Sequence, residues 1–249
     1  MKRPVLAANW KMNNGPTAAN AFMTTFLNAY KARDDRTIVI FPPALDLTAV
    51  AASASERTDV IAGIQNIHWA EKGAFTGEIS AEMAKDAGAR MVLVGHSERR
   101  HVFGETDAQC AKKCEAATRA NLGFMLCVGE KIEQREAGET ERVVVRQLRE
   151  GLSQVRNLIS ADFLIAYEPV WAIGTGLTAS ATDASAIHTL LRSQLREMIG
   201  KRGSDIPILY GGSVNTSNAP SLLAAPEVDG LLVGGASVDP ASWLAIAQT

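Results

Sequence analysis

Eight short apolar runs recur along the chain, and longer segments with amphipathic helical periodicity separate them. Short runs of this kind are typical of strands buried on both faces of a parallel sheet. No break in composition interrupts the series, so one parallel α/β domain over residues 1–249 is expected. The predicted strands are Val5–Ala8, Ile38–Phe41, Val60–Ile64, Met91–Val94, Phe124–Val128, Phe163–Tyr167, Ile208–Tyr210 and Gly230–Val233.

The segments between these strands predict helices, with typical starts at Asp107 and Thr182 and typical ends at Gly88 and Gly200. The number of strand–helix units and the length of 249 residues favour a single-domain (β/α)8 barrel over an open doubly wound sheet. The predicted helices are Thr17–Ala32, Ser80–Ala87, Glu105–Ala120, Glu139–Asn157, Thr182–Ile199, Thr216–Ala224 and Pro240–Ala247, with a weaker pattern over Asp46–Ala54.

Charge and cysteine content exclude several classes of protein. A formal net charge of -2 provides no electrostatic basis for binding nucleic acid or an anionic membrane. The three cysteines, Cys110, Cys114 and Cys127, are too few and odd in number for a disulfide framework, and no Cys or His nearby in sequence completes a metal site. No apolar run suits a signal peptide or membrane span, so a cytoplasmic protein without a bound metal is expected.

Polar side chains with reactive groups follow several of the predicted strands. In a barrel the site forms where the carboxyl ends of the strands meet. Taken singly, each residue has an ordinary explanation, since a loop lysine is usually solvated and a glutamate before proline can be a cap. Their joint position at strand ends predicts a site made from Asn9, Lys11, His96, Glu98, Glu130 and Glu168.

Glycine pairs end the last two predicted strands, in "YGGS" (210–213) and "VGGAS" (233–237). Glycine allows backbone N–H groups to approach an anion, and barrels often bind phosphate after the seventh and eighth strands. Tight turns would also use glycine, but two consecutive pairs here favour phosphate binding. The chain has neither GxxxxGK[ST] nor GxGxxG, so no P-loop or dinucleotide fingerprint competes.

A carboxylate at a dry barrel mouth becomes a stronger base, and an imidazole can polarise a carbonyl. A lysine beside them can offset the charge of an enolate oxygen or a phosphate. Glu168, His96 and Lys11 therefore suit proton abstraction next to a carbonyl.

Seven motifs occur in order over nearly the whole chain: "NWKMN", "GAFTGE", "VGHSERR", "CVGE", "AYEPVWAIGTG", "YGGSV" and "DGLLVGGAS". The ordered set closely resembles the triosephosphate isomerase family. The resemblance implies a TIM barrel that interconverts dihydroxyacetone phosphate and D-glyceraldehyde 3-phosphate without a cofactor, through an enediolate, in glycolysis and gluconeogenesis.

By this resemblance Glu168 is the base, His96 a neutral electrophile and Lys11 the group that stabilises negative charge. Asn9 hydrogen-bonds near the same oxygens. Supporting roles go to Ser97, which holds Glu168 in the empty site, to Glu98 beside Lys11 and His96, and to the pair Tyr210 and Ser213, which latch a lid over 170–179. The phosphate is expected on the backbone N–H groups of Gly174, Ser213, Gly234 and Gly235.

The loop Gly73–Glu78 is implied to enter a second subunit and bring Thr76 beside that subunit's Asn9 and Lys11, which makes a homodimer. Arg192 and Asp229 resemble a structural ion pair of the family, and Leu177 stands in the lid where lysine is frequent. Two alternatives remain open: another phosphosugar isomerase or epimerase barrel, and a catalytically idle barrel that serves as a binding protein.

Overall fold

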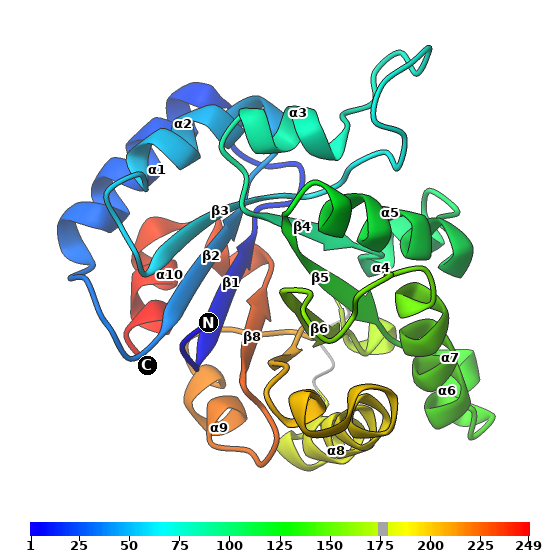
Figure 1. Ribbon diagram of the computed structural model, residues 1–249. Coiled ribbons are helices and arrows are strands. Elements are labelled where there is room, and N and C mark those ends of the chain that lie inside the picture. Colours follow the sequence, from blue (N-terminus) through cyan, green and yellow to red (C-terminus); the bar gives the residue numbers. More distant parts are fainter. Residues whose placement is uncertain (174–178) are drawn as a thin grey trace.

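Eight parallel strands close into a barrel at the centre of the molecule, and helices surround it (Figure 1). This closed sheet confirms the predicted (β/α)8 barrel. The computed structural model describes residues 1–173 and 179–249. The strands are β1 (Val5–Asn9), β2 (Thr37–Phe41), β3 (Val60–Ile64), β4 (Met91–Val94), β5 (Gly123–Val128), β6 (Phe163–Tyr167), β7 (Ile208–Tyr210) and β8 (Gly230–Val233).

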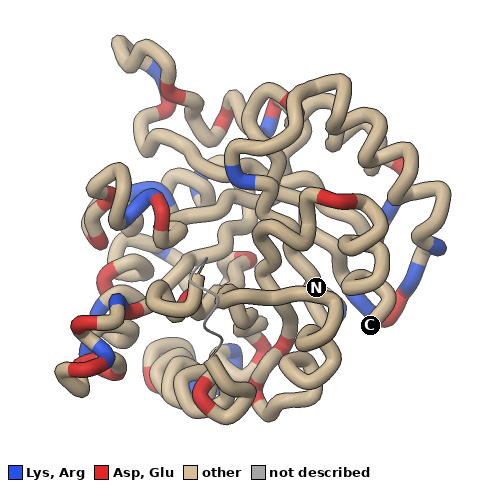
Figure 2. The backbone as a smooth tube through the Cα atoms, turned by 180° about the vertical axis from the view of Figure 1, so that it is seen from behind, with Lys and Arg blue, Asp and Glu red and all other residues tan. Residues whose placement is uncertain are grey.

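The strands pair in sequence order, and β8 returns to β1 with Val5 beside Gly230. At this contact a Cβ on Gly230 would lie 1.9 Å from the carbonyl oxygen of Val5, so the close approach requires glycine. Lys, Arg, Asp and Glu lie mainly on the outer helices and loops, with both signs interspersed (Figure 2).

Side chains alternate along each strand between two apolar cores. One set packs inside the barrel, and the other packs between the strands and the helices. The interior set is Val5, Ala7, Val39, Phe41, Ile61, Met91, Leu93, Met125, Cys127, Leu164, Ala166, Leu209 and Leu232.

The helices are α1 (Pro16–Ala29), α2 (Leu47–Ser53), α3 (Ala81–Asp86), α4 (Ser97–His101), α5 (Asp107–Arg119), α6 (Ile132–Glu136), α7 (Thr140–Leu152), α8 (Ala181–Ile199), α9 (Ala219–Leu223) and α10 (Pro240–Ala247). Short 3₁₀ helices are η1 (Ala44–Asp46), η2 (Val170–Ala172), η3 (Gly200–Ser204) and η4 (Gly235–Ser237). Most match a predicted segment, whereas α4 and α6 are too short for a periodic pattern and were not predicted.

Several predicted helices are shorter in the structure, and in two of them side chains take up backbone hydrogen-bonding groups at the shortened end. The Asn215 side-chain oxygen accepts from the backbone N–H of Ser217 at 2.9 Å and of Asn218 at 3.0 Å, which holds a turn where a helix was expected to begin. The Ser153 hydroxyl donates to the Glu150 carbonyl at 2.7 Å, and α7 ends there rather than at residue 157.

Candidate active site

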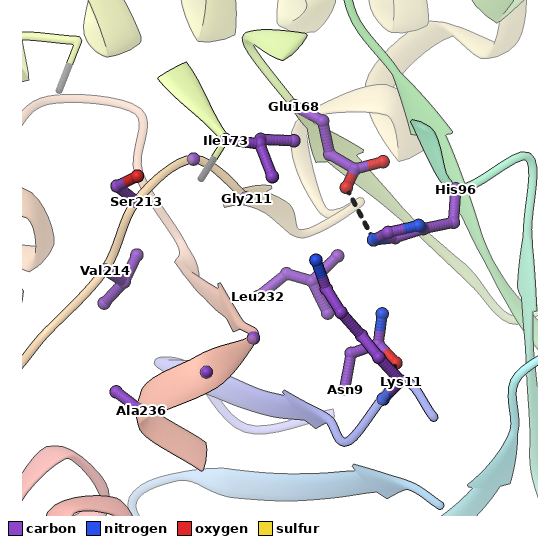
Figure 3. A pocket seen from close by; sticks show the side chains of 13 residues that line it. Asn9, Lys11, His96, Glu168, Ile173, Gly211, Ser213, Val214, Leu232 and Ala236 are labelled. Carbon is purple, nitrogen blue, oxygen red and sulfur yellow. Dashed lines mark hydrogen bonds and ion pairs between the residues drawn. The ribbon is translucent and has the colours of Figure 1, made fainter. Parts of the chain in front are cut away.

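A cavity of about 250 Å³ opens where the carboxyl ends of the strands meet (Figure 3). Among the predicted site residues, Asn9, Lys11, His96, Glu168, Ser213, Gly234 and Gly235 all line this one cavity. The remaining lining residues are Ile173, Gly211, Gly212, Val214, Leu232 and Ala236.

Strand alternation aims Glu168 and Asn9 into the barrel. Leu164 and Ala166 of β6 point inward, and Glu168 has the same parity one step beyond the strand. Val5 and Ala7 place Asn9 in the same way. Both polar residues are buried, with exposed fractions of 2% for Glu168 and 3% for Asn9. The polar ends of two core strands thus meet in a nearly dry space.

Glu168 is held by three groups from the end of β4, of which Figure 3 shows the His96 ring. Its Oε1 lies 3.0 Å from His96 Nε2. The Ser97 backbone N–H donates to Oε2 at 3.0 Å, and the Ser97 hydroxyl donates to Oε1 at 3.3 Å. The structure therefore brings together Ser97 and Glu168, as the resemblance implied.

His96 also caps a helix. The backbone N–H of Glu98 donates to His96 Nδ1 at 3.3 Å at the start of α4. An Nδ1 that accepts carries no proton, so this partner assigns the hydrogen to Nε2, which donates to Glu168. The electropositive N-terminus of α4 further disfavours a charged imidazole.

Opposing influences act on both members of this pair. Burial disfavours their charged forms, but the contact between them outweighs burial and raises the pKa of His96 above its usual range. Burial likewise works against ionised Glu168, yet His96, the Ser97 N–H and the Cys127 thiol together lower the pKa of that carboxyl. Glu168 is thus a stabilised carboxylate, and therefore a weak base, while it stays in these contacts.

Lys11 reaches the cavity from an unusual backbone conformation, with φ at +53°. Its N–H donates to Asn9 Oδ1 at 3.0 Å, and its carbonyl accepts from Gln65 Nε2 at 2.9 Å. Its ammonium lies 2.7 Å from Oε1 of Glu98, whose side chain is 45% exposed. Glu98 therefore orients the Lys11 ammonium on the cavity wall, and solvent screens the ion pair between them.

Three of the four cavity glycines stand where side chains approach closely. A Cβ on Gly212 would lie 2.1 Å from the Tyr210 hydroxyl, one on Gly211 2.9 Å from Glu168 Cγ, and one on Gly234 3.2 Å from Lys11 Cε. A Cβ on Gly235 would meet nothing within 4 Å. Backbone without side chains therefore forms the cavity wall from Gly211, beside Glu168, to Gly234, beside Lys11, which suits an anion held by amides.

Ser213 and Tyr210 lie near the segments on either side of residues 174–178. The Ser213 hydroxyl donates to the Ala172 carbonyl at 2.5 Å. Burial raises the pKa of Tyr210 to about 12, against the opposing influence of the Ala179 backbone. Ser213 therefore contacts the segment before residues 174–178, and Tyr210 lies near Ala179 on the other side without a hydrogen bond from its hydroxyl to any residue that the structure describes. Gly174 and Leu177 lie outside the described residues.

Thr76 is not brought to the cavity. It lies on the exposed loop between β3 and α3 that projects from the barrel (Figure 1). Leu232 and Val214 line the cavity but were not predicted, because an apolar residue carries no chemical signal in sequence. The inward parity of Leu232 on β8 could have identified it.

Two further features concern cofactors and membranes. Within residues 1–173 and 179–249, no three His, Cys, Asp or Glu side chains gather so as to hold a metal ion. The helices of this part of the chain include none with the length and apolarity needed to cross a membrane.

Comparisons with known proteins agree on one family. The family model for triosephosphate isomerase matches residues 4–249. Triosephosphate isomerase of Moorella thermoacetica is 46% identical over 248 residues, covering 99% of this chain and 98% of the relative. That of Solibacter usitatus is 44% identical over 247 residues, with 99% of both chains covered. The crystal structure of triosephosphate isomerase from Bartonella henselae superposes with a TM-score of 0.88 at 36% identity, covering 99% of this chain and 98% of that one.

Proposed function

The chain belongs to the triosephosphate isomerase family, and from that premise we propose how its residues interconvert dihydroxyacetone phosphate and D-glyceraldehyde 3-phosphate. This aldose–ketose isomerisation moves a proton between adjacent carbons through an enediolate. It needs a base over the carbons, a group that exchanges protons with the oxygens, and a positive charge beside them. The observation that carries the proposal is the meeting of Glu168, His96 and Lys11 on one cavity with a glycine wall.

Glu168 is the proposed base, and its basicity depends on which groups it contacts. In the contacts with His96 and Ser97 its pKa is lowered. Turned instead toward substrate, beside Ile173 and Leu232, the carboxylate would lose those donors and keep the effect of burial. Burial alone raises the pKa of a carboxyl, so this movement would turn a stabilised carboxylate into a stronger base.

His96 is the proposed electrophile toward the two substrate oxygens. Departure of Glu168 removes the main influence that raises the pKa of His96; burial and Lys11, which lower this pKa, then oppose the smaller raising effect of Glu98. The imidazole would then be neutral, with a proton on Nε2 to donate to a substrate oxygen. Lys11 and Asn9 would offset and hydrogen-bond the negative charge that develops on the same oxygens.

The phosphate is proposed to sit on backbone N–H groups of Ser213, Gly234 and Gly235, with Gly174 as a further donor. Its support is the glycine wall, where no side chain blocks approach, and the Lys11 ammonium nearby. Oriented amides can hold a dianion in a chain whose formal net charge is -2.

A homodimer is proposed through the loop Gly73–Glu78. The support is a run of exposed apolar side chains beside the site: Met12 and Phe103 line one hollow with Lys11, and Phe103 and Phe75 line the next. A partner's Thr76 would enter the first hollow and contact Asn9 and Lys11.

We propose that the enzyme is cytoplasmic, because its three cysteines are buried and unpaired.

A coupled isomerase assay on the purified chain tests this function. Dihydroxyacetone phosphate should be converted without added metal, and a pentose phosphate should not react. Turnover of a pentose phosphate in place of the triose would favour the epimerase alternative. No turnover, with phosphate still bound, would favour a binding protein.

A further inference from the structure

Arg135 of α6 lies between two segments that adjoin residues 174–178. On one side its guanidinium carbon lies 4.5 Å from the centroid of the Trp171 ring. On the other, Nη2 donates to Asp183 Oδ1 at 2.9 Å, near the start of α8. One side chain therefore contacts the last turn before this stretch and the first turn after it.

Each contact is anchored to a further polar network. The Trp171 indole N–H donates to Glu130 Oε1 at 2.8 Å, and the Tyr167 hydroxyl donates to the same fully buried carboxylate at 3.1 Å. Arg135 Nη1 lies 3.8 Å from this Glu130 oxygen. The stacking of Arg135 on the indole and its charge beside Glu130 thus hold Trp171 against the end of β6. Glu168 is the residue that directly follows this strand.

The Asp183 contact is anchored through the cap of α8. Asp183 Oδ2 accepts from the Ser180 N–H at 3.1 Å and from the Ser180 hydroxyl at 2.7 Å. The Ser180 oxygen in turn accepts from the Asp183 N–H at 3.0 Å. A shift of Arg135 would be transmitted to Ser180 and hence to Ala179, whose backbone faces Tyr210.

We propose that Arg135 is a positioning residue of the isomerase site, whose guanidinium links Trp171 to the capped start of α8. This inference rests on the proposed function. The linkage sets the positions of Ile173 on the cavity wall and of Ala179 beside Tyr210. The linkage needs a planar cation whose face stacks on the Trp171 indole while its edge donates to Asp183. The ammonium of a lysine does not provide this combination.

The test compares Arg135→Gln, Asp183→Asn and the double variant, with Arg142→Gln as the matched control. Arg142 is an exposed arginine of the adjacent α7, paired with Glu139. In Asp183→Asn the side-chain amide oxygen would still accept from Ser180 and so keep the cap of α8. We expect Arg135→Gln and Asp183→Asn each to lower kcat/KM by about tenfold, since loosened walls displace the reacting groups.

The double variant should lose no more than Arg135→Gln alone, because both changes break one linkage. A phosphorylated enediolate mimic should bind more weakly by a similar factor, and Arg142→Gln should match the unaltered chain. Arg135→Lys should fail to restore activity, since it keeps the charge without the stack.

Two results would overturn the role of Arg135. One is a kcat/KM within about twofold of the unaltered chain in both single variants. The other is a lowered Tm with unchanged kcat/KM and unchanged affinity for the mimic. Multiplicative losses in the double variant would show two separate contacts and would also overturn the linkage. An unaltered chain that does not turn over triose phosphate would instead overturn the proposed function.

Discussion

The contact between Glu168 and His96 controls the protonation of both side chains. It raises the pKa of His96 and lowers the pKa of Glu168, and in each residue it acts against the effect of burial. The contact between Glu168 Oε1 and His96 Nε2, at 3.0 Å, is the largest influence opposing burial in both shifts. A movement of the Glu168 side chain alone would therefore change the charge preference of both groups, without rearrangement of the barrel.

The glycine wall makes a prediction about substrate binding. Gly234→Val would place a branched side chain against Lys11 Cε, 3.2 Å from the new Cβ, and across the proposed phosphate site. We expect KM for triose phosphate to rise by at least about tenfold, as the loss of one or two charge-assisted hydrogen bonds predicts. Steady-state kinetics measure this, with Gly15→Val as control because its Cβ meets nothing within 4 Å. An unchanged KM would place the phosphate elsewhere.

His188 predicts how stability depends on pH. It is fully buried, its Nδ1 donates to the Glu227 carbonyl at 2.9 Å, and Arg192, Glu227 and Asp229 are the charged groups that act on it. Burial lowers the pKa of His188 to about 4, from 6.5 in the unfolded chain. The unfolded chain therefore takes up the proton first as pH falls, and stability is lost between pH 6.5 and about 4.

That loss amounts to about 3 kcal/mol at most, from the size of the pKa shift. Urea unfolding of His188→Gln should lack this component of the pH dependence. Equal slopes of stability against pH for His188→Gln and the unaltered chain would contradict the assignment.

The strands could be predicted almost to the residue, because each is a short continuous apolar run, as is typical of strands buried on both faces. Val60–Ile64, Met91–Val94 and Phe163–Tyr167 have the predicted bounds. Helix ends were less predictable, since they depend on local hydrogen bonds such as those of Asn215 and Ser153. The short helix α4 was not predicted, although its N-terminus orients His96.

The polar side of the site could also be predicted, since strand ends meet in a barrel and a reactive side chain there stands out. Leu232, on the apolar wall, carries no such signal. The link made by Arg135 could not be predicted, because Trp171 and Asp183 are distant from it in sequence and meet it only through folding.

Strand packing at the mouth of the barrel makes a further prediction. Gly129, after β5, lies where a Cβ would be 1.7 Å from the Glu168 carbonyl oxygen. Gly129→Ala must push the ends of β5 and β6 apart, so we expect the free energy of unfolding to fall by about 3 kcal/mol and kcat to fall with it. Denaturant unfolding with Gly15→Ala as control measures the change. An alanine variant of normal stability would show that the strand ends are not tightly packed.

The exposed apolar surface is the feature of the whole molecule that bears on assembly. Phe75 is 47% exposed on the projecting loop, and Ile159, at the opposite end of the barrel, is 64% exposed. We expect Phe75→Asp to shift the chain toward a monomer and lower kcat/KM by about tenfold, because a charge is costly in an interface core. Ile159→Asp is the matched control and should do neither. Sedimentation velocity measures the assembly; a Phe75→Asp dimer with full activity would remove this loop from the interface.

In the proposed function, the barrel holds the Glu168 carboxylate where it can take a proton from the substrate and return it. The most direct test is turnover of D-glyceraldehyde 3-phosphate by Glu168→Gln, which keeps the shape of the side chain and removes the base. We predict that kcat falls by at least about a thousandfold, within the range expected for loss of a general base, while a phosphorylated enediolate mimic still binds. Turnover close to that of the unaltered chain would contradict the assignment of Glu168 as the base.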